Sequence, residues 1–335
     1  MPKVKRPRKL DALDRRILAH LIVNSNRPIV ALAEHLEVNS ETLRYRIERL
    51  KRRKILKRFI TYIDTSLLGY TNLLVFFRVH GKDAKKLKHF FNNLVNNNYI
   101  TYVAETIGKW DGICELTVKN FNEAIEIMEG MRDKLALNSL EYEIHLERKM
   151  YTMRARIFEE AYEYSKPLEI NRYPSNQVIN IDKKDFQILS ILSTGGDITL
   201  KKLAETMGMS INTVKNRIER LESLGIIRGY SVTIDEATLG FNRITLLLKL
   251  LEVPKTRISE FLEEILSQKN ILNITECFGV YGLIIDIYAE DFRTIVALLK
   301  KLNRKYSDVF GFYDLTIVVE ELKREYFPSI TIEKS

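Results

Sequence analysis

The chain repeats itself in register at an offset of 171 residues. Asp14 returns as Asp185 and Gly108 as Gly279, and no insertion separates the two copies in between. The repeated segments include Leu32-Ala33-Glu34 with Leu203-Ala204-Glu205, Arg46-Ile47-Glu48-Arg49-Leu50 with Arg217-Ile218-Glu219-Arg220-Leu221, and Ile63-Asp64 with Ile234-Asp235. The units of solenoid proteins are usually about 20–50 residues long. This chain is therefore a duplication of a whole module, and each half has to fold as a unit of its own.

The composition is that of a soluble globular protein with room for several domains. The 335 residues include 45% hydrophobic and 29% charged side chains. No apolar run reaches the roughly 18–20 residues that span a bilayer, so no membrane association is expected. Cys114 and Cys277 lie in apolar stretches, which favours buried free thiols in a reducing cytoplasm. The cysteines and histidines have no metal-ligand spacing, and we expect neither a metal nor a cofactor.

Positive charge is concentrated at the start of the chain. The net charge is +9, whereas residues 1–58 alone hold 17 Lys and Arg against 6 Asp and Glu, an excess of 11. The equivalent segment of the second half, 177–230, holds 8 against 6. A basic face of this kind is typical of nucleic-acid-binding proteins. A solvated basic surface without a partner is the alternative.

Each half opens with three predicted helices and a predicted wing. Apolar residues recur at helical spacing in all three, and Asn39 and Ser210 are good N-cap residues for the third. Two short helices at a tight turn, the second with an apolar stripe and a basic outer face, indicate a helix-turn-helix. Alternating polarity after the third helix predicts a β-hairpin wing. The helices are expected near 13–21, 29–36 and 40–52 and near 188–192, 200–207 and 211–224, and the wings at 55–63 and 226–234.

The third helix of each half is the candidate recognition helix. Its N-terminal residues and outer face can enter the major groove of double-stranded DNA, where Arg, Lys and Asn side chains read base edges. The candidate DNA-binding residues are Ser40, Glu41, Thr42, Arg44, Tyr45, Arg46 and Arg49 in the first half and Ile211, Asn212, Thr213, Lys215, Asn216, Arg217 and Arg220 in the second. Helix-turn-helix units also occur in purely structural roles. Two of them with basic outer faces favour DNA binding.

The segment LAETMGMSINTVKNRIERLESLGIIRGYSVTIDEATLG of the second half resembles the DNA-binding module of the Lrp/AsnC (leucine-responsive regulatory protein) family. The resemblance rests on a Leu-Ala pair, a Gly before the cap, an R-I-x-x-L recognition helix, a Gly-Ile-Ile entry to the wing and a closing Leu-Gly. The first half departs from this pattern, because Glu37 stands in place of Gly208 and Lys54 in place of Gly225. Glycine at a helix C-terminus supplies a left-handed conformation at little steric cost, so these replacements put the turn geometry in question.

The second part of each half has the order strand, helix, strand, strand, helix, strand, which is the ferredoxin-like motif. The expected fold class is therefore α+β, with two copies of a winged helix-turn-helix followed by a ferredoxin-like βαββαβ domain. The connector between the halves is interpreted as a spacer that is helical in part, and a partner-binding segment is the alternative. The expected boundaries are 1–65 and 181–236 for the winged helix-turn-helix domains, 66–150 and 237–330 for the ferredoxin-like domains, and 151–180 for the linker.

The resemblance also implies an effector site. In that family the sheet domain senses a small effector, typically an amino acid, at a G-x-x-D turn between subunits, and Gly108-Lys109-Trp110-Asp111 matches the turn. The candidate effector-binding residues are Thr106, Gly108, Trp110 and Asp111. Asp111 would pair with an ammonium group, whereas the second half has Gly282 in its place. The alternative is a structural turn in which Asp111 caps backbone N–H groups.

The expected function is therefore a sequence-specific double-stranded DNA-binding transcriptional regulator, not an enzyme, that acts in the cytoplasm. Its two halves would pair within one chain as a pseudo-dimer, or the chain would form a homo-oligomer. Siroheme decarboxylases are built from similar modules and are the enzyme alternative, although Trp110 is the only tryptophan and the sequence places no histidine near it or near Tyr281. A ligand sensor that does not bind DNA is the third possibility.

Overall fold

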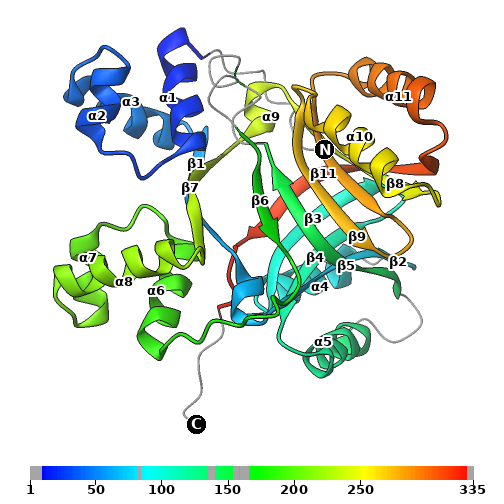
Figure 1. Cartoon of the computed structure of the whole chain (residues 1–335), viewed down its shortest axis with the longest axis horizontal. Coiled ribbons are helices and arrows are strands. Elements are labelled where there is room, and N and C mark those ends of the chain that lie inside the picture. The colour runs from blue at the N-terminus through cyan, green and yellow to red at the C-terminus, as the bar shows by residue number, and fades with distance from the viewer. Residues whose placement is uncertain (1–9, 82–83, 135–139, 154–157, 159–165, 330–335) are drawn as a thin grey trace.

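The computed structural model describes residues 10–81, 84–134, 140–153, 158 and 166–329. Each half begins with the three expected helices, which form two similar units on one side of the molecule (Figure 1). The side chains of Asn39 and Ser210 accept from the backbone N–H groups of Thr42 and Thr213, so both predicted N-caps are confirmed. The helices are α1 (Ala12–Val23), α2 (Ile29–His35) and α3 (Ser40–Arg52), and α6 (Lys183–Thr194), α7 (Leu200–Met207) and α8 (Ile211–Ser223).

The first unit keeps the turn geometry of the second without the two glycines. Gly208 and Gly225 have left-handed φ angles of 62° and 73°, and Glu37 and Lys54 adopt nearly the same values, 58° and 56°. After α2 the N–H of Val38 donates to the carbonyl of Ala33 at 3.0 Å, which is the hydrogen bond that closes this kind of helix end. The left-handed conformation is unfavourable by about 1–2 kcal/mol for a residue with a Cβ. The packing of the first unit offsets this cost.

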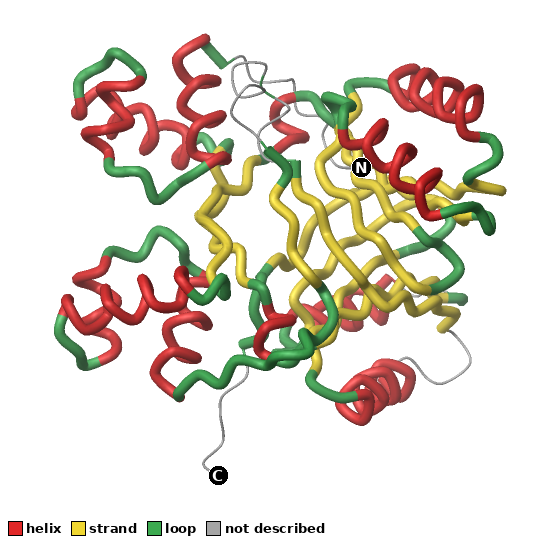
Figure 2. Tube along the Cα trace, in the orientation of Figure 1, coloured by secondary structure: helices red, strands yellow, loops and turns green. Residues whose placement is uncertain are grey.

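The expected β-hairpin wings are wrong. Each wing segment is a single strand, β1 (Leu56–Ile63) or β7 (Ile227–Ile234), and the two strands pair antiparallel with each other across the halves. The ends of this ribbon are exchanged, because Val232 and Ile234 enter the core of the first helical unit while Ile63 enters that of the second. Figure 2 shows the ribbon between the two groups of helices. The ribbon therefore holds the two helix-turn-helix units together as one body.

The rest of each half forms the expected ferredoxin-like unit, and this part of the fold prediction is confirmed. The strand orders are β5-β2-β4-β3 and β11-β8-β10-β9, and both sheets are antiparallel. The first unit contains β2 (Thr71–Val79), α4 (Ala84–Val95), β3 (Ile100–Gly108), β4 (Gly112–Val118), α5 (Phe121–Lys134) and β5 (Leu140–Thr152). The second contains β8 (Asn242–Leu250), α10 (Lys255–Leu266), β9 (Ile271–Phe278), β10 (Leu283–Ala289), α11 (Phe292–Tyr306) and β11 (Phe310–Arg324).

The last strand of each half extends beyond its own sheet, and its C-terminal residues join the two sheets. The first part of β5 pairs with β2 of its own sheet, and residues 146–152 pair with β9 of the other. In the same way, β11 pairs first with β8 and then, through residues 316–324, with β3. Eight strands therefore close into a ring, with two helices outside each sheet (Figure 1). The two halves pair within one chain.

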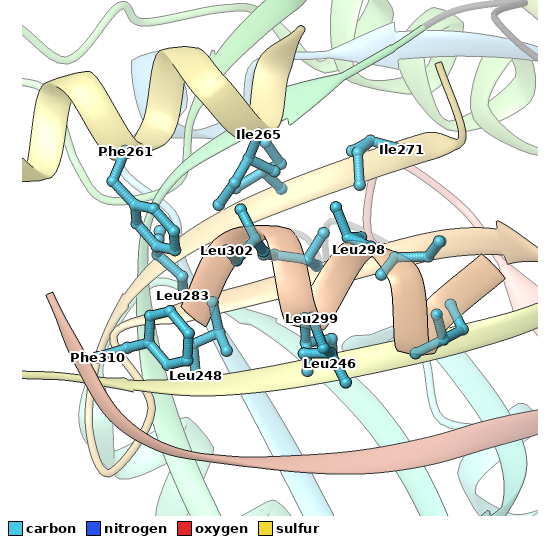
Figure 3. Close-up of a cluster of buried hydrophobic side chains, with 14 of the residues drawn as sticks. Leu246, Leu248, Phe261, Ile265, Ile271, Leu283, Leu298, Leu299, Leu302 and Phe310 are labelled. Atoms are coloured by element: carbon cyan, nitrogen blue, oxygen red, sulfur yellow. The ribbon is translucent and has the colours of Figure 1, made fainter. Parts of the chain in front are cut away.

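Three apolar layers hold this part together. Each sheet packs its outer face against its two helices, as Figure 3 shows for α10 and α11, where Phe261, Leu298 and Leu302 meet Leu246 and Leu283. A third layer lies between the sheets and includes Trp110 and Tyr281, which occupy the same repeat position and are both fully buried. Burial of one large side chain contributes about 1.5–3 kcal/mol. The interior between the sheets is therefore a core built by both halves.

The connector includes one further strand. β6 (Leu168–Asn171) adds to β5, while much of the segment expected to be helical lies outside the described residues. Two short helical turns, η1 (Thr65–Leu68) and α9 (Glu236–Leu239), lead from the ribbon into the sheets. Cys114 and Cys277 are free and buried, as expected. No helix in the described ranges is long and apolar enough to cross a membrane, and no cluster there is arranged to hold a metal ion.

Candidate DNA-binding and effector sites

The recognition helices expose most of the residues expected to read DNA. In α3, Arg44 and Tyr45 are exposed, and 58% of the Tyr45 surface is accessible. In α8 the exposed residues include Lys215 and Asn216 at the same repeat positions, together with Ile211, Asn212 and Thr213 on the first turn. Buried Leu43, Ile47 and Leu50, and Val214, Ile218 and Leu221, fix the opposite side of each helix. The exposed faces therefore differ in chemistry, with Arg and Tyr in one half and Lys and Asn in the other.

Four arginines expected on the DNA-facing side also form ion pairs within their own helical unit. Arg217 and Arg220 donate to the carboxylate of Asp185 at 2.7 and 2.8 Å, and Asp185 is fully buried. The hydrogen bonds to Asp185 and Asp182 raise the pKa of Arg217. In the first half, Arg46 and Arg49 pair with Asp14 in the same way, at 3.1 and 2.5 Å. These ion pairs fasten each recognition helix to the first helix of its unit, and the contact of the four arginines with DNA stays a prediction.

A cleft of about 750 Å³ separates the two helix-turn-helix units. Its walls carry equivalent residues of α3 and α8, with Arg44 and Lys51 on one side and Lys215 and Glu222 on the other. The N–H of Gly196 donates to the carbonyl of Phe59 at 3.2 Å, and the equivalent Ser25 donates to Tyr230 at the same distance. Because Phe59 and Tyr230 belong to β1 and β7, these hydrogen bonds fasten both helical units to the ribbon, which sets the spacing between the recognition helices.

The structure brings the four candidate effector residues together at the turn between β3 and β4. Thr106 donates through its hydroxyl to the carbonyl of Trp110 at 2.8 Å, and the carboxylate of Asp111 accepts from the N–H of Val79 at 2.9 Å. A Cβ on Gly108, which has φ 135°, would lie 2.6 Å from the carbonyl oxygen of Leu315 in the other half. The turn thus lies where the two sheets join. The Asp111 contact is the one that a turn cap would make.

The second turn has little room for a side chain at the position of the acid. A Cβ at Gly282, the counterpart of Asp111, would lie 2.7 Å from side-chain atoms of Leu250. Leu250 is the counterpart of Val79, whose N–H the Asp111 carboxylate binds. Lys109 lies between the two turns, where its ammonium group contacts Asp314 at 3.0 Å and the Tyr281 hydroxyl. The two halves therefore fill equivalent positions with different chemistry.

The expectation that no histidine lies near Trp110 or Tyr281 is wrong. His145 on β5 stacks on Tyr281 with 5.3 Å between ring centroids, and its Nε2 accepts from the Tyr281 N–H at 3.2 Å. Burial, assisted by the charge of Lys109, lowers the pKa of His145 to about 4, so the ring is neutral at neutral pH. Its Nδ1 and the indole Nε1 of Trp110 are buried without a hydrogen-bond partner among the described residues. No sequence signal marks His145, because its counterpart is Thr316.

A buried ion cluster between connector and sheet was also missed. Arg172, just after β6, pairs with Glu115 at 2.5 Å and with Glu147 at 2.7 Å, and the three side chains are 3, 14 and 2% exposed. Burial and the nearby charge of Glu115 raise the pKa of Glu147 to about 7. Burial also acts to raise the pKa of Glu115. The charge of Arg172 and the hydrogen bond from the Thr101 hydroxyl outweigh this effect, so the pKa of Glu115 is lowered. One guanidinium therefore balances the charge of one carboxylate, and the cluster is neutral when Glu147 is protonated.

This cluster predicts that stability falls as the pH rises through the Glu147 pKa. The folded pKa of about 7 lies above the ordinary value of 4.5, so the folded chain binds more protons between these values and loses stability up to and through pH 7. Glu147→Gln keeps an oxygen for Arg172 but removes the titration. At pH 8 the free energy of unfolding of this variant, measured in urea, should exceed that of the parent chain by about 1–3 kcal/mol. At pH 5 the two should be nearly equal.

The matched control is Glu169→Gln on neighbouring β6. The Glu169 side chain is 55% exposed and pairs with Lys149 on the surface, so its removal should change stability by about 0–1 kcal/mol at both pH values. A Glu147→Gln variant with the same stability difference at pH 5 and pH 8 would contradict a raised pKa at this position.

Known family models match both helical units. A winged helix-turn-helix DNA-binding model matches residues 181–228, and an AsnC-type helix-turn-helix domain model matches residues 10–51. An uncharacterised HTH-type transcriptional regulator of Pyrococcus furiosus is 32% identical over 146 residues, which cover 43% of this chain and 94% of the relative. LrpB of Bacillus subtilis is 27% identical over 159 residues, which cover 45% of this chain and 97% of LrpB. These relatives are about as long as one half of this chain.

Solved structures include one type that matches both halves. The siroheme decarboxylase NirDL superposes with a TM-score of 0.63 at 17% identity and covers 94% of each chain. Its complex with an iron-uroporphyrin III analogue gives 0.62. At this identity the similarity shows a shared fold.

Proposed function

The chain belongs to the Lrp/AsnC family of helix-turn-helix transcriptional regulators, and from this premise we propose that it binds double-stranded DNA sequence-specifically through both recognition helices. The observation that carries the proposal is the pair of exposed helix faces held at one spacing by the β1–β7 ribbon. Arg44 and Tyr45 on α3 and Lys215 and Asn216 on α8 are the base-reading residues. Arg favours guanine and Asn favours adenine. The two halves of the operator therefore differ in sequence.

The test is the affinity for an operator selected from random DNA. Arg44→Ala with Tyr45→Ala should reduce affinity about 10- to 100-fold and relax sequence preference only in the half-site read by α3, because one good base contact is worth about 1–3 kcal/mol. Lys215→Ala with Asn216→Ala should do the same in the other half-site. Fluorescence anisotropy with half-site variants of the duplex measures both effects.

The control is Lys255→Ala, which removes an exposed positive charge at the start of α10, in a sheet domain. This variant should bind the operator like the parent chain. A perfect palindrome from the selection, or equal loss at both half-sites with either double variant, would contradict separate reading by the two helices.

The proposed regulator also responds to a small zwitterion such as an amino acid, bound near the β3–β4 turn of the first half. Asp111 is the acid of this turn, whereas its counterpart Gly282 offers none. Because a buried unpaired ammonium group is unfavourable by several kcal/mol, Asp111→Asn should abolish effector binding in calorimetry of an amino-acid panel. The asparagine oxygen can still accept from Val79, so the melting temperature should stay the same. A lowered melting temperature with binding intact would make Asp111 a turn cap only.

A siroheme-type substrate is the second candidate, and it rests on a specific observation. His145 lies between the sheets of a chain that shares the NirDL fold over 94% of its length. The indole and imidazole N–H groups without described partners lie in the same layer. A spectroscopic titration with siroheme distinguishes the candidates: saturable binding that His145→Ala abolishes supports the enzyme, and its absence together with operator binding supports the regulator.

A further inference from the structure

Two helices on the outside of the ring expose the same apolar pair. Phe121 and Ile125 on α5 are 66% and 53% exposed, and Phe292 and Val296 on α11 are 58% and 47% exposed. These residues correspond at the 171-residue offset, so both halves present a phenylalanine and a β-branched residue one turn apart. Figure 1 shows α5 and α11 on opposite sides of the strands. Each chain therefore has two equivalent apolar faces that point away from each other.

The charges beside these pairs have opposite sign. Glu126 and Glu129 are exposed on α5, whereas Lys300 and Arg304 are exposed on α11. Glu129 and Lys300 occupy the same repeat position, one turn beyond Ile125 and Val296. This difference in charge is confined to the residues next to the apolar pairs, because α5 also exposes a positive charge, Arg132, farther along the helix. The two halves thus share the exposed apolar pair but carry opposite charges next to it.

We propose that the α5 face of one chain docks on the α11 face of a second copy. Like faces would place Glu129 against Glu129 or Lys300 against Lys300 and repel, whereas unlike faces pair Glu129 with Lys300 beside a shared apolar contact. Such a contact is heterologous, because it joins two different surfaces of identical chains. It therefore leaves one free face at each end and extends into a ring or an open row of chains.

The apolar residues and the acidic face favour a second copy over nucleic acid. Phosphate would find Lys300, Arg304 and Arg293 on α11, but it would be repelled by Glu126 and Glu129 at the equivalent face of α5. Exposed phenylalanines at both faces add nothing to phosphate binding, whereas apolar side chains ringed by charge are typical of protein contacts. The occupant that satisfies both faces at once is another copy of this chain.

The two faces are single helices, so each contact is small. Stable protein interfaces bury about 1,200–2,000 Å² in total, more than one pair of helix faces provides. Association should therefore depend on concentration and weaken with salt, because screening reduces the Glu129–Lys300 attraction. On DNA, chains bound at neighbouring operators would have a raised local concentration and associate more readily.

The experiment is sedimentation velocity of the full chain over a concentration series. The parent chain should form species larger than its closed single-chain form at low salt and lose them at 1 M NaCl. Glu129→Lys and Lys300→Glu should each weaken association about tenfold. The double variant E129K/K300E restores complementary faces and should recover it. An equimolar mixture of the two single variants should also assemble, because each offers the face the other needs.

The control Glu263→Lys makes the same change in net charge as Glu129→Lys, at an exposed position of α10, and it should associate like the parent chain. Association that survives both single variants, or that fails to return in the double variant and in the mixture while circular dichroism shows folded chains, overturns the proposal. A parent chain that stays single at every concentration also overturns it. Loss of DNA affinity in Lys300→Glu without any change in self-association assigns the α11 face to nucleic acid instead.

Discussion

Replacing Asp185 with alanine should lower the free energy of unfolding by about 3 kcal/mol, near the lower end of the range for breaking a buried ion pair. Asp185 is fully buried and accepts from both Arg217 and Arg220. Loss of the carboxylate leaves these guanidinium groups beside apolar core. The cost stays near 3 kcal/mol because the Arg220 side chain is already 52% exposed and can turn into water. Urea unfolding followed by circular dichroism measures the change.

Asp182→Ala is the matched control. Asp182 also contacts Arg217 and caps α6, but its side chain is 53% exposed. Its removal should cost about 1 kcal/mol, the usual value for an N-cap. Asp14→Ala should repeat the Asp185 result in the first half, because Asp14 is 1% exposed and holds Arg46 and Arg49. Equal losses for Asp182→Ala and Asp185→Ala would mean that burial of the pair contributes nothing.

Local patterns in the sequence were enough for the parts of the fold that depend on near neighbours. Helical spacing, N-caps at Asn39 and Ser210, and the strand–helix order predicted both helix-turn-helix units and both ferredoxin-like domains. Even Glu37 and Lys54 keep the left-handed turns, because packing of the surrounding helices outweighs a local cost of about 1–2 kcal/mol.

Contacts between the halves could not be predicted in the same way. The alternation at 55–63 predicts a strand but does not name its partner, and pairing with a strand 171 residues away satisfies it as well as a hairpin does. The C-terminal residues of β5 and β11 could not be predicted as strands for the same reason, since they pair with the sheet of the other half. Arg172 could not be foreseen because both of its acidic partners lie in strands distant in sequence.

At the candidate DNA site, residue type alone did not reveal the ion pairs of the arginines. Arg46 and Arg217 look like groove-facing cations, yet they turn toward buried acids. A signal for this was present: Asp14 and Asp185 repeat at the same offset as the arginines and lie three residues before Ile17 and Ile188, on the apolar side of each helix. An acid that recurs on the buried side of a helix requires a buried partner, and the repeated arginines were the available ones.

Affinity for double-stranded DNA should fall steeply with salt, and the first helix-turn-helix unit should carry most of the effect. Six to ten phosphate contacts lose on the order of 10³–10⁵ in affinity between about 50 and 200 mM salt. Residues 1–58 have an excess of 11 positive charges, whereas the equivalent second segment has 8 cations against 6 acids. The ion-paired arginines occur in both halves, so they do not account for this difference. Binding isotherms at several NaCl concentrations give the slope.

This prediction can be tested by exchanging the residues of the two halves at two equivalent positions. Arg52 and Lys54 are exposed in the first half, and their counterparts in the second are Ser223 and Gly225. Arg52→Ser with Lys54→Gly should reduce the slope of log affinity against log salt by about 1.8 if both contact phosphate, since each contact contributes about 0.9. Glycine also suits the left-handed turn at position 54, so Lys54→Gly does not strain the fold. The reverse exchange, Ser223→Arg with Gly225→Lys, should steepen the slope. A flat plot for the parent chain would remove the electrostatic basis for DNA binding, and an unchanged slope in both exchanges would place the phosphate contacts elsewhere on the first unit.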